Sequence, residues 1–310
     1  MAKRFDLLVL GDANPDLILR VDAAPAFGQV ETIVEDATLV LGGSGAIMAC
    51  GATRLGLSVA IAGVIGDDVF GRFVRGSIEE EGIDTQALRV DGTRPTGLSM
   101  ILARPDDRAI LTSTGTIADL RGSSLDPDLI ESARHVHVSS YYMQRALQRD
   151  LPALFDTAHA RGATTSIDPN WDPDERWDSG LLELLDRTDV FFPNEAEARA
   201  ITGIDDAEAA AKALAEHRTV VVVKLGTDGG LAVDANGVVR RESIPSDVVD
   251  TIGAGDSFDA GFLAGRLLEW PLERCLRLAV ACGSISTKSA GGTGAQPTLD
   301  EAVGTMERAI

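Results

Sequence analysis

Cysteine is scarce in this chain of 310 residues, and the cysteines that occur follow no ligand or disulfide spacing. Cys50, Cys275 and Cys282 are odd in number, include no C-x-x-C pair, and lie in apolar helical patterns. These features argue against a disulfide framework and against a cysteine zinc site. They favour a reducing compartment, so we expect a cytoplasmic protein.

Long apolar runs are also missing. No stretch reaches the roughly 18 to 20 apolar residues that a membrane span needs. The opening stretch MAKRFDLLVLGDANPD is too short for the apolar region of a signal peptide, and Asp6 interrupts it. It predicts a first β-strand, and we expect no membrane partner.

Positive charge is the third scarcity. The chain has 28 lysines and arginines against 48 acidic residues, for a net charge of −20. A general nucleic-acid-binding protein carries a basic face, so this balance argues against nucleic acid as a partner. A small anionic ligand stays possible, because helix N-termini and one or two cations are enough to hold a phosphate.

Short apolar runs alternate with helix-like stretches along the whole chain. FDLLVLG, SVAIAGVIG, HVHVSS, ATTSIDP, DVFFPN and TVVVVKLG have the length and composition of buried strands. Helical spacing occurs over residues 44–56, 68–82, 150–161, 194–202, 206–217, 255–269, 271–289 and 298–309. This order predicts an α/β fold in one domain over residues 1–310, with a doubly wound, mainly parallel sheet covered on both faces.

Two stretches depart from this order. Residues 14–40 and 86–113 alternate apolar and polar side chains, which is typical of antiparallel strands with one wet face. Two such excursions from one core can meet as a small β-sheet. We therefore expect a lid over the site, formed by these two ranges.

The stretch DTIGAGDSFDAGFLAG, residues 250–265, carries the most specific chemical signal. An extended segment runs into a glycine turn, and helical spacing follows. Free N–H groups at a helix N-terminus, together with the helix dipole, stabilise negative charge. Asp256 lies within this turn, either as an N-cap or as a general base that accepts the proton of an attacking hydroxyl.

This stretch resembles the C-terminal signature of the ribokinase-like (PfkB-type) carbohydrate kinases, D-T-x-G-A-G-D-x-F-x-x-G. Other segments resemble the same family: LGDANPDLIL, LGGSGAIMACGATRLG, PNEAEARAITG, VVKLGTDGGL and GAQP. The chain contains neither a G-x-x-x-x-G-K-[ST] loop nor a clean G-x-G-x-x-G after its first strand. A P-loop kinase and a dinucleotide-dependent oxidoreductase are both weakened.

The resemblance implies a ribokinase-like fold and an ATP-dependent phosphotransferase acting on a hydroxyl, preferably primary, of a small sugar or sugar derivative. It implies ATP and Mg²⁺ as cofactors and K⁺ as an optional monovalent cation. Asp256 would be the base, beside the anion-holding turn residues Gly253, Ala254 and Gly255. The substrate would contact Asn14, Asp16, Gly42, Gly43, Ile47, Arg108 and Tyr141.

The nucleotide would contact Asn194, Lys224, Gly226, Thr227 and Gly229. Asn194 and Glu197 would order Mg²⁺ through water, and Asp250 with the carbonyl of Ile252 would hold the monovalent cation.

Each of these residues also has a simpler interpretation. Asn194 and Glu197 could be a helix cap and an exposed acid. Lys224 and Asp250 could simply end strands, Asp16 could cap a turn, and Arg108 could be a solvated hairpin charge.

Ile47 departs from the family pattern, because many sugar kinases have Asn at this position after the Gly pair. This replacement puts ribose in doubt as the substrate and leaves another sugar, a sugar acid or a nucleoside open. The alternatives are a nucleoside kinase of the same fold and a non-catalytic sugar- or nucleotide-binding protein on this scaffold. Lid strands often pair in the family, so a homodimer through the lid is a further expectation.

Overall fold

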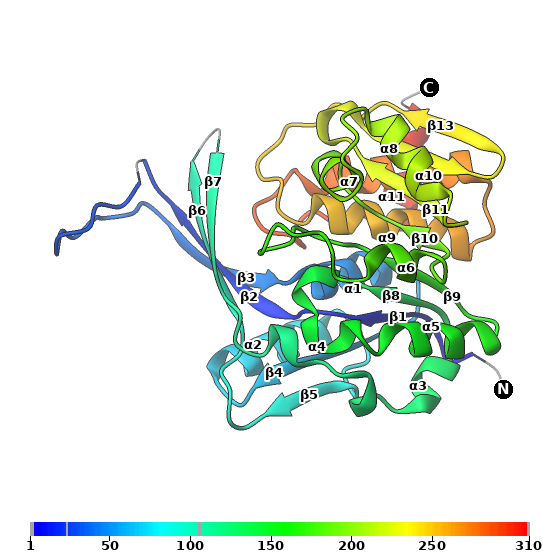
Figure 1. Cartoon of the computed structure of the whole chain (residues 1–310). Helices are drawn as coiled ribbons and strands as arrows, with labels where there is room; N and C mark the ends of the chain where they lie inside the picture. Colours follow the sequence, from blue (N-terminus) through cyan, green and yellow to red (C-terminus); the bar gives the residue numbers. More distant parts are fainter. Residues whose placement is uncertain (1–2, 23, 105–106, 309–310) are drawn as a thin grey trace.

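Two sheets of different size organise the protein. The computed structural model describes residues 3–22, 24–104 and 107–308. A nine-stranded sheet forms the centre of the body, and a four-stranded sheet projects from one side of it (Figure 1). None of the helices in the described ranges is both long and apolar enough to cross a membrane.

The large sheet has the order β13-β12-β11-β10-β9-β8-β1-β4-β5. The seven strands from β11 to β5 pair in parallel, whereas β12 and β13 add antiparallel at one edge. The parallel strands are β1 (Phe5–Leu10), β4 (Val59–Gly66), β5 (Leu88–Asp91), β8 (Ala133–Val138), β9 (Thr164–Ile167), β10 (Val190–Phe191) and β11 (Val220–Lys224). The edge strands are β12 (Gly230–Asp234) and β13 (Gly237–Arg241).

Helices cover both faces of this sheet, and its strands are therefore apolar on both sides. Leu7 and Val9 point into one core, while Leu8 and Leu10 point into the other. The first core packs against α1 (Ser44–Arg54), α2 (Val69–Glu80), α9 (Ala254–Leu267), α10 (Leu272–Ser286) and α11 (Leu299–Arg308). The second packs against α3 (Pro127–Glu131), α4 (Arg145–Gln148), α5 (Leu151–Ala160), α6 (Leu181–Leu185), α7 (Glu195–Thr202) and α8 (Ala207–Ala215).

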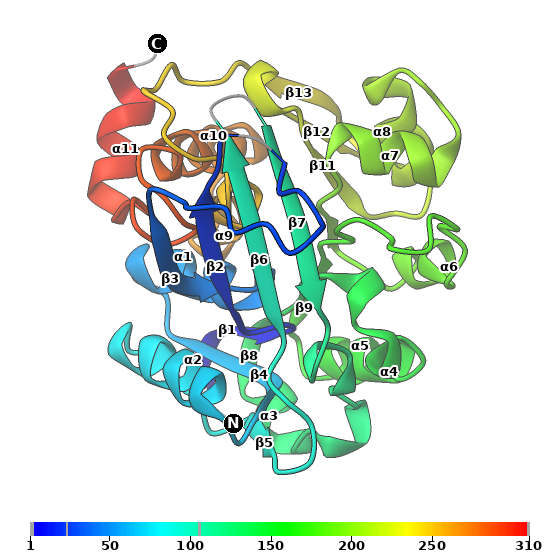
Figure 2. The ribbon, with the colours of Figure 1, turned by 90° about the vertical axis from the view of Figure 1, so that its left-hand side faces the viewer.

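The small sheet has the order β3-β2-β6-β7 and lies in front of the body in Figure 2. Its strands are β2 (Asn14–Arg20), β3 (Ala37–Gly42), β6 (Leu98–Arg104) and β7 (Asp107–Ser113). β2 pairs antiparallel with β3 and parallel with β6, so the two sequence excursions meet side by side. We call these four strands and the 21–36 connection the lid.

The sequence correctly predicted an α/β fold with a mainly parallel sheet and a separate small sheet. Three details differ. Residues 88–91 pair with β4 in the large sheet rather than with the lid, and β3 continues to Gly42. The edge strands β12 and β13 were not predicted. The predicted lid ranges also contain residues 23, 105 and 106, and the last predicted helix contains residue 309, all of which lie outside the described residues.

Candidate active site

The glycine-rich stretch forms the turn that opens helix α9. Gly253 is the N-cap residue with φ +70°, and the helix begins at Ala254. Glycine has no side chain with which to cap the helix, so no side chain occupies the first-turn N–H groups, although Ala254 N donates to Thr251 O at 3.4 Å. Asp256 lies inside the first turn. The alternative that Asp256 is the N-cap is therefore wrong.

Close packing explains why residue 253 is a glycine. A Cβ atom on Gly253 would come within 2.6 Å of Gly292 Cα and 2.8 Å of Ile47 Cγ2. Its positive φ is also a conformation that other residues adopt only with strain. The glycine turn of residues 253–256 is thus packed closely between helix α1 and the 290–294 loop.

Asp256 is a half-buried carboxyl with a strong affinity for its proton. Burial, and next the charge of Asp168, raise its pKa to about 8, against the opposing effect of Lys224. A hydrogen bond from Ser44, the first residue of α1, also lowers this pKa. Asp256 therefore faces the N-terminus of α1, and the N-termini of α1 and α9 meet at this point.

Asp12 follows strand β1 and receives the N-terminus of α1. Its two carboxylate oxygens accept hydrogen bonds from Ser44 N and Gly45 N, each at 3.2 Å. Burial raises the pKa of Asp12. Asp12 was not among the predicted site residues, although an acid two residues after the first strand lies at the carboxyl edge where parallel sheets place ligands.

Asn14, Asp16, Gly42 and Gly43 form one polar corner where β2 pairs with β3. Asn14 Nδ2 donates to Asp16 Oδ1 at 3.2 Å. A Cβ on Gly42 would lie 2.1 Å from Asp16 Cγ, and one on Gly43 would lie 2.9 Å from Asn14 Oδ1. Burial, followed by the charge of Asp12, raises the pKa of Asp16 to about 7. The two glycines thus make room for the two polar side chains.

Lys224 lies at the end of β11 and is held by two buried carboxyl groups. Its Nζ atom is 2.7 Å from Asp168 Oδ2 and 3.3 Å from Asp259 Oδ2. The predicted interpretation of Lys224 as a phosphate contact did not include these partners. Asp168 and Asp259 were not identified from the sequence, and only the three-dimensional structure brings them together.

Asn194 and Glu197 form a reciprocal capping box at the start of α7. Glu197 N donates to Asn194 Oδ1, and Asn194 N donates to Glu197 Oε2, both at 2.8 Å. The helix-cap interpretation is therefore present in the structure. Glu197 is buried rather than exposed, and burial, with the nearby charge of Asp168, raises its pKa to about 7.

The predicted nucleotide turn follows β11 as a single 3-10 turn, Gly226–Asp228. Gly226 and Gly229 have φ of +57° and +90°. A Cβ on Gly229 would come within 2.1 Å of Arg241 O, so this position requires glycine. Thr227 is exposed at the tip, and its carbonyl accepts a hydrogen bond from Ser243 Oγ.

Asp250 connects the start of the catalytic segment to the C-terminal loop. Its Oδ1 atom accepts from Ile252 N at 3.0 Å, and Oδ2 accepts from Gly291 N at 2.9 Å. Arg108 reaches this segment from the lid, donating to Thr251 Oγ1 at 2.7 Å and lying 3.8 Å from Asp250 Oδ1. Arg108 is therefore more than a solvated hairpin charge, because it links the lid to the catalytic segment.

Ile47 was a predicted substrate contact, but the structure buries it. It is 3% exposed and packs with Ile18, Ile101 and Ile252. This small apolar cluster joins α1, two lid strands and the catalytic segment. The aliphatic side chain of Ile47 thus packs the lid against the body.

Tyr141, another predicted substrate contact, is 1% exposed in the second core. Its hydroxyl donates to Ser179 O at 2.8 Å, and its ring packs edge-on against Tyr142. These contacts give Tyr141 a structural role and leave its hydroxyl already occupied.

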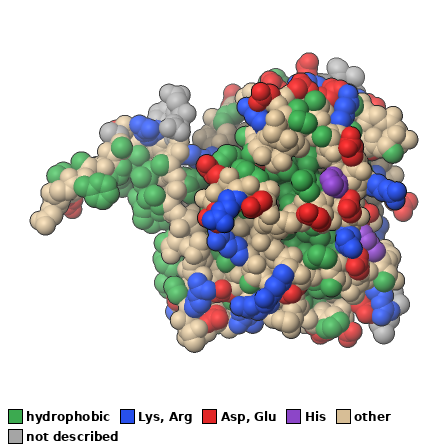
Figure 3. All heavy atoms as spheres, viewed as in Figure 1, with side chains coloured by type: hydrophobic (Ala, Val, Ile, Leu, Met, Phe, Trp, Pro, Cys, Tyr) green, Lys and Arg blue, Asp and Glu red, His purple; other side chains and the backbone are tan. Residues whose placement is uncertain are grey.

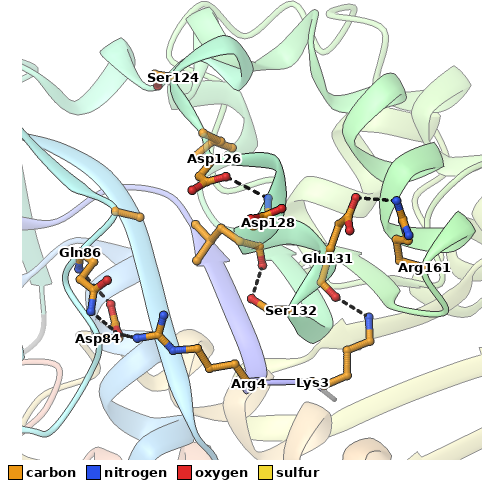
Figure 4. Close-up of a pocket in the computed structure, with 13 residues that line it drawn as sticks. Lys3, Arg4, Asp84, Gln86, Ser124, Asp126, Asp128, Glu131, Ser132 and Arg161 are labelled. Carbon is orange, nitrogen blue, oxygen red and sulfur yellow. Dashed lines mark hydrogen bonds and ion pairs between the residues drawn. The ribbon is translucent and has the colours of Figure 1, made fainter. Parts of the chain in front are cut away.

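Two larger cavities differ in what surrounds them. One of about 640 Å³ lies between the lid and the 248–252 segment, and charged side chains of both signs line it: Arg20, Asp22, Glu35, Arg104, Arg108 and Asp250. The other, about 540 Å³, lies at the opposite edge, near the amino ends of β1 and β8 (Figure 4). None of the predicted site residues lines the second cavity.

The cations of the second cavity already have partners. Arg4 pairs with Asp84 at 2.6 Å, and Arg161 pairs with Glu131 at 2.8 Å. Lys3 donates to the Glu131 carbonyl at 3.0 Å (Figure 4). This arrangement serves local structure.

Within the described ranges, no group of three or more His, Cys, Asp or Glu residues is arranged so that it could hold a metal ion. Single carboxylate and amide oxygens are nevertheless hard donors that suit Mg²⁺, which keeps several of its waters. Taken together, the site combines N–H groups for an anion, a proton-accepting carboxyl and a polar corner for hydroxyl groups.

Comparison with known proteins gives a consistent picture. The pfkB family carbohydrate kinase profile matches residues 4–299. An ATP-dependent ribose-1-phosphate kinase from Halopiger xanaduensis is 32% identical over 295 residues, covering 95% of each chain. A 5-dehydro-2-deoxygluconokinase from Geobacillus thermodenitrificans is 30% identical, covering 85% of this chain and 83% of the relative.

Among solved structures, a putative ribokinase II from E. coli in complex with ATP and Mg²⁺ superposes with a TM-score of 0.86. It is 24% identical, and the match covers 99% of this chain and all of the other. At this identity the likeness shows the shared fold.

Proposed function

Since this chain belongs to the pfkB family of carbohydrate kinases and is an ATP-dependent carbohydrate kinase, we propose that it phosphorylates a hydroxyl, preferably primary, of a small sugar or sugar derivative. The observation that carries this proposal is the position of Asp256. It lies in the first turn of α9, which no side chain caps, and it faces the N-terminus of α1 and Asp12, which follows β1.

Asp256 acts as the general base. Its pKa of about 8 is close to neutral, where a base combines adequate ionisation with good proton affinity. It takes the proton of the attacking hydroxyl as the oxygen bonds to the γ-phosphorus of ATP and the bond to the β-phosphate oxygen breaks. The N–H groups of residues 253–256 stabilise the charge that develops on the transferring phosphoryl group.

The sugar is held by the corner of Asn14 and Asp16 over Gly42 and Gly43. A carboxylate oxygen accepts hydrogen bonds from sugar hydroxyls, and the amide orients it. The close approach of Asp16 to Gly42 supports this assignment, since it holds the carboxylate in one place.

The nucleotide is held by the turn of Gly226, Thr227 and Gly229, beside Asn194. Mg²⁺, when bound, neutralises the β- and γ-phosphates. Glu197 and Asn194 would hold its waters, since buried oxygen donors suit this ion. The ATP and Mg²⁺ in the E. coli neighbour, together with the ATP-dependent relative, support this choice of cofactors.

Asp250 and the carbonyl of Ile252 are the candidate ligands for K⁺. The carboxylate of Asp250 joins residue 252 to the 290–294 loop through two backbone hydrogen bonds. A cation at this place would stiffen the segment that carries Asp256.

The lid closes on the sugar and excludes water, which limits wasteful hydrolysis of ATP. Its surface exposes large apolar side chains, at Phe27, Val30, Ile33, Leu39, Ile110 and Leu111. These residues define the lid patch, and Figure 3 shows apolar side chains gathered on the projecting arm. A patch of this kind supports a homodimer formed through the lid. The buried free thiols of Cys50, Cys275 and Cys282 support a reducing cytoplasm.

The test is ADP release with Mg²⁺ and K⁺ over a panel of sugars, sugar acids, sugar phosphates and nucleosides, with Asp256→Asn as the negative control. Acceptor-dependent ADP from one sugar class is the expected result. Activity restricted to nucleosides would replace the sugar proposal by a nucleoside kinase. No ADP with any acceptor, together with measurable binding of ATP and a sugar, would favour a binding protein.

A further inference from the structure

A buried cluster of Lys224, Asp168 and Asp259 lies beneath the catalytic turn. Lys224 ends strand β11, Asp168 directly follows β9, and Asp259 lies in helix α9. Lys224 Nζ is 2.7 Å from Asp168 and 3.3 Å from Asp259, and the three side chains are only 13%, 8% and 1% exposed. Because β10 separates β9 from β11 in the sheet, the cluster ties two non-adjacent strand ends to one helix.

The pKa values of the two carboxyl groups in the cluster are shifted in opposite directions. Burial opposes the ionisation of Asp168, but the Lys224 ammonium holds the pKa of this carboxyl below its usual range. Burial raises the pKa of Asp259 well above its usual range, and the neighbouring Asp168 carboxyl raises it further. The Lys224 ammonium therefore favours ionisation of its nearer partner, Asp168, whereas burial favours the protonated form of Asp259.

The cluster contacts the catalytic turn in two ways. The aliphatic part of Lys224 lies against Gly255, since a Cβ on that glycine would be 3.4 Å from Lys224 Cδ. Asp259 follows Asp256 by three residues in α9, so the two lie on neighbouring turns of the same helix face. The first turn of α9 is thus in contact with the aliphatic part of Lys224, and Asp259 holds the Lys224 ammonium from the next turn of the same helix.

The competing interpretation is that Lys224 contacts the phosphates of ATP. In that case its ammonium would have to leave two buried carboxyl groups, and Asp168 would keep a buried charge without its partner. Asp259 Oδ1 is already buried without a hydrogen-bond partner, so this corner has no spare donor to replace the ammonium. The geometry favours a lysine that stays in place.

We propose that Lys224 is a positioning residue, held by Asp168 and Asp259, that fixes the first turn of α9 and keeps a positive charge beneath Asp256. This role rests on the proposed phosphoryl transfer with Asp256 as base. On this proposal, Lys224 positions the base Asp256 and does not contact the nucleotide.

The test compares Lys224→Met, which keeps the length of the side chain and removes its charge, with Lys212→Met. Lys212 is an exposed lysine in α8 that pairs with Glu208, so it is a matched control for the substitution. Two further variants address Asp259: Asp259→Asn keeps a neutral hydrogen-bonding group, and Asp259→Leu removes it. Thermal unfolding of each variant, with and without a non-hydrolysable ATP analogue, identifies any that fails to fold.

The first readout is the ¹³C NMR titration of aspartate carboxyl groups, with the Asp256 signal assigned by Asp256→Asn. Loss of the ammonium should raise the pKa of Asp256 by about one unit in Lys224→Met, and Lys212→Met should leave it unchanged. The second readout is kinetic: kcat should fall roughly 10- to 100-fold in Lys224→Met while KM for ATP stays within about threefold. Asp259→Leu should lose more kcat than Asp259→Asn.

Two results would overturn the proposal. A rise of about tenfold or more in KM for ATP and in the Kd of the analogue, with an unchanged Asp256 titration, would make Lys224 a phosphate ligand. An equal loss of kcat in folded Asp259→Asn and Asp259→Leu would show that Asp259 does not hold Lys224 in place. If the natural chain phosphorylates nothing in the panel, the proposed function fails, whereas the carboxyl titration and analogue binding still decide the place of Lys224.

Discussion

The carboxyl group of Asp16 lies so close over Gly42 that a Cβ atom on the glycine would be 2.1 Å from Asp16 Cγ. Gly42→Ala must therefore displace Asp16 from the polar corner. If this corner holds the sugar, kcat/KM for the sugar should fall roughly 100-fold, since a shift of about 1 Å in a positioning group has an effect of that size. KM for ATP should hardly change, because the nucleotide turn follows a different strand.

Gly76→Ala is the control for this substitution. Gly76 lies in helix α2 with open space around its Cα, and alanine there should stabilise the helix by about 0.5–1 kcal/mol. A Gly42→Ala enzyme as active as Gly76→Ala would contradict the assignment of Asp16 to the sugar.

Asp256→Asn should lower kcat by about 10²- to 10⁴-fold, the range that a general base contributes. Binding of ATP should persist, because the backbone N–H groups of the turn remain. Calorimetry with the nucleotide and a coupled ADP assay would separate the two quantities. Full activity in this variant would remove Asp256 from the role of base.

The pH dependence of activity follows from the raised pKa of Asp256. The base must be ionised to accept a proton, so kcat/KM should rise with pH and level off above about pH 8. A pH–rate profile that is flat from about pH 6 to 9 would contradict this prediction.

The same shift has an opposite effect on stability. The folded state holds the Asp256 proton more tightly than the unfolded state, so this group contributes most below about pH 4, and its contribution is lost as pH rises through about 8. Asp256→Asn, with its permanently neutral side chain, should therefore unfold at a higher temperature than the natural chain at about pH 9. Equal unfolding temperatures at that pH would argue against a raised pKa of Asp256 in the folded state.

Asp250→Ala should remove the acceptor of two backbone N–H groups, those of Ile252 and Gly291. An unpaired buried donor costs about 1–3 kcal/mol, so the catalytic segment should loosen. If Asp250 also holds K⁺, the stimulation of activity by K⁺ over Na⁺ should disappear in this variant. The exposed Asp247 lies in the same segment, and Asp247→Ala should keep the response of the natural enzyme.

The lid patch should mediate dimer formation. Leu111 is 59% exposed on β7, and Leu111→Glu would place a charge in the proposed interface. Light scattering during size-exclusion chromatography should show a dimer for the natural chain and a monomer for this variant. Leu182→Glu, on α6 of the body, is the control and should stay dimeric. A natural chain that is monomeric at all concentrations would exclude the lid dimer.

Sequence patterns predicted the elements of the body well, because each reflects a local property. Strand β4 is buried at all eight positions, and its sequence is an uninterrupted apolar run. The edge strand β13 was missed because it is only partly buried, so its apolar signal is weak. Strand β12 is buried at four of its five positions, but its sequence GLAVD is too short to show a clear pattern. Strand β5 was assigned to the lid because alternation along a strand does not reveal which sheet it joins.

The candidate site divides in the same way. The GAGD turn was recognisable because glycines let a backbone turn approach an anion at a helix N-terminus, and because the acid within it matches the family signature. Ile47 was placed at the substrate because it stands where many sugar kinases have Asn, and Tyr141 because it follows a strand at the carboxyl edge of the sheet. Both side chains instead pack into apolar clusters. Asp259 carried no local pattern that distinguishes it from an ordinary acid, and the only signal for Asp12 was its place after the first strand.

By itself, the sequence determined the α/β body, the small separate sheet and the glycine turn before α9, since periodicity and glycine placement are local consequences of backbone geometry. Only the tertiary structure decided the partners of Lys224. Asp168 lies 56 residues before it and Asp259 lies 35 residues after it. Their meeting depends on strand order and on the position of α9 over the sheet, which no short stretch of sequence encodes.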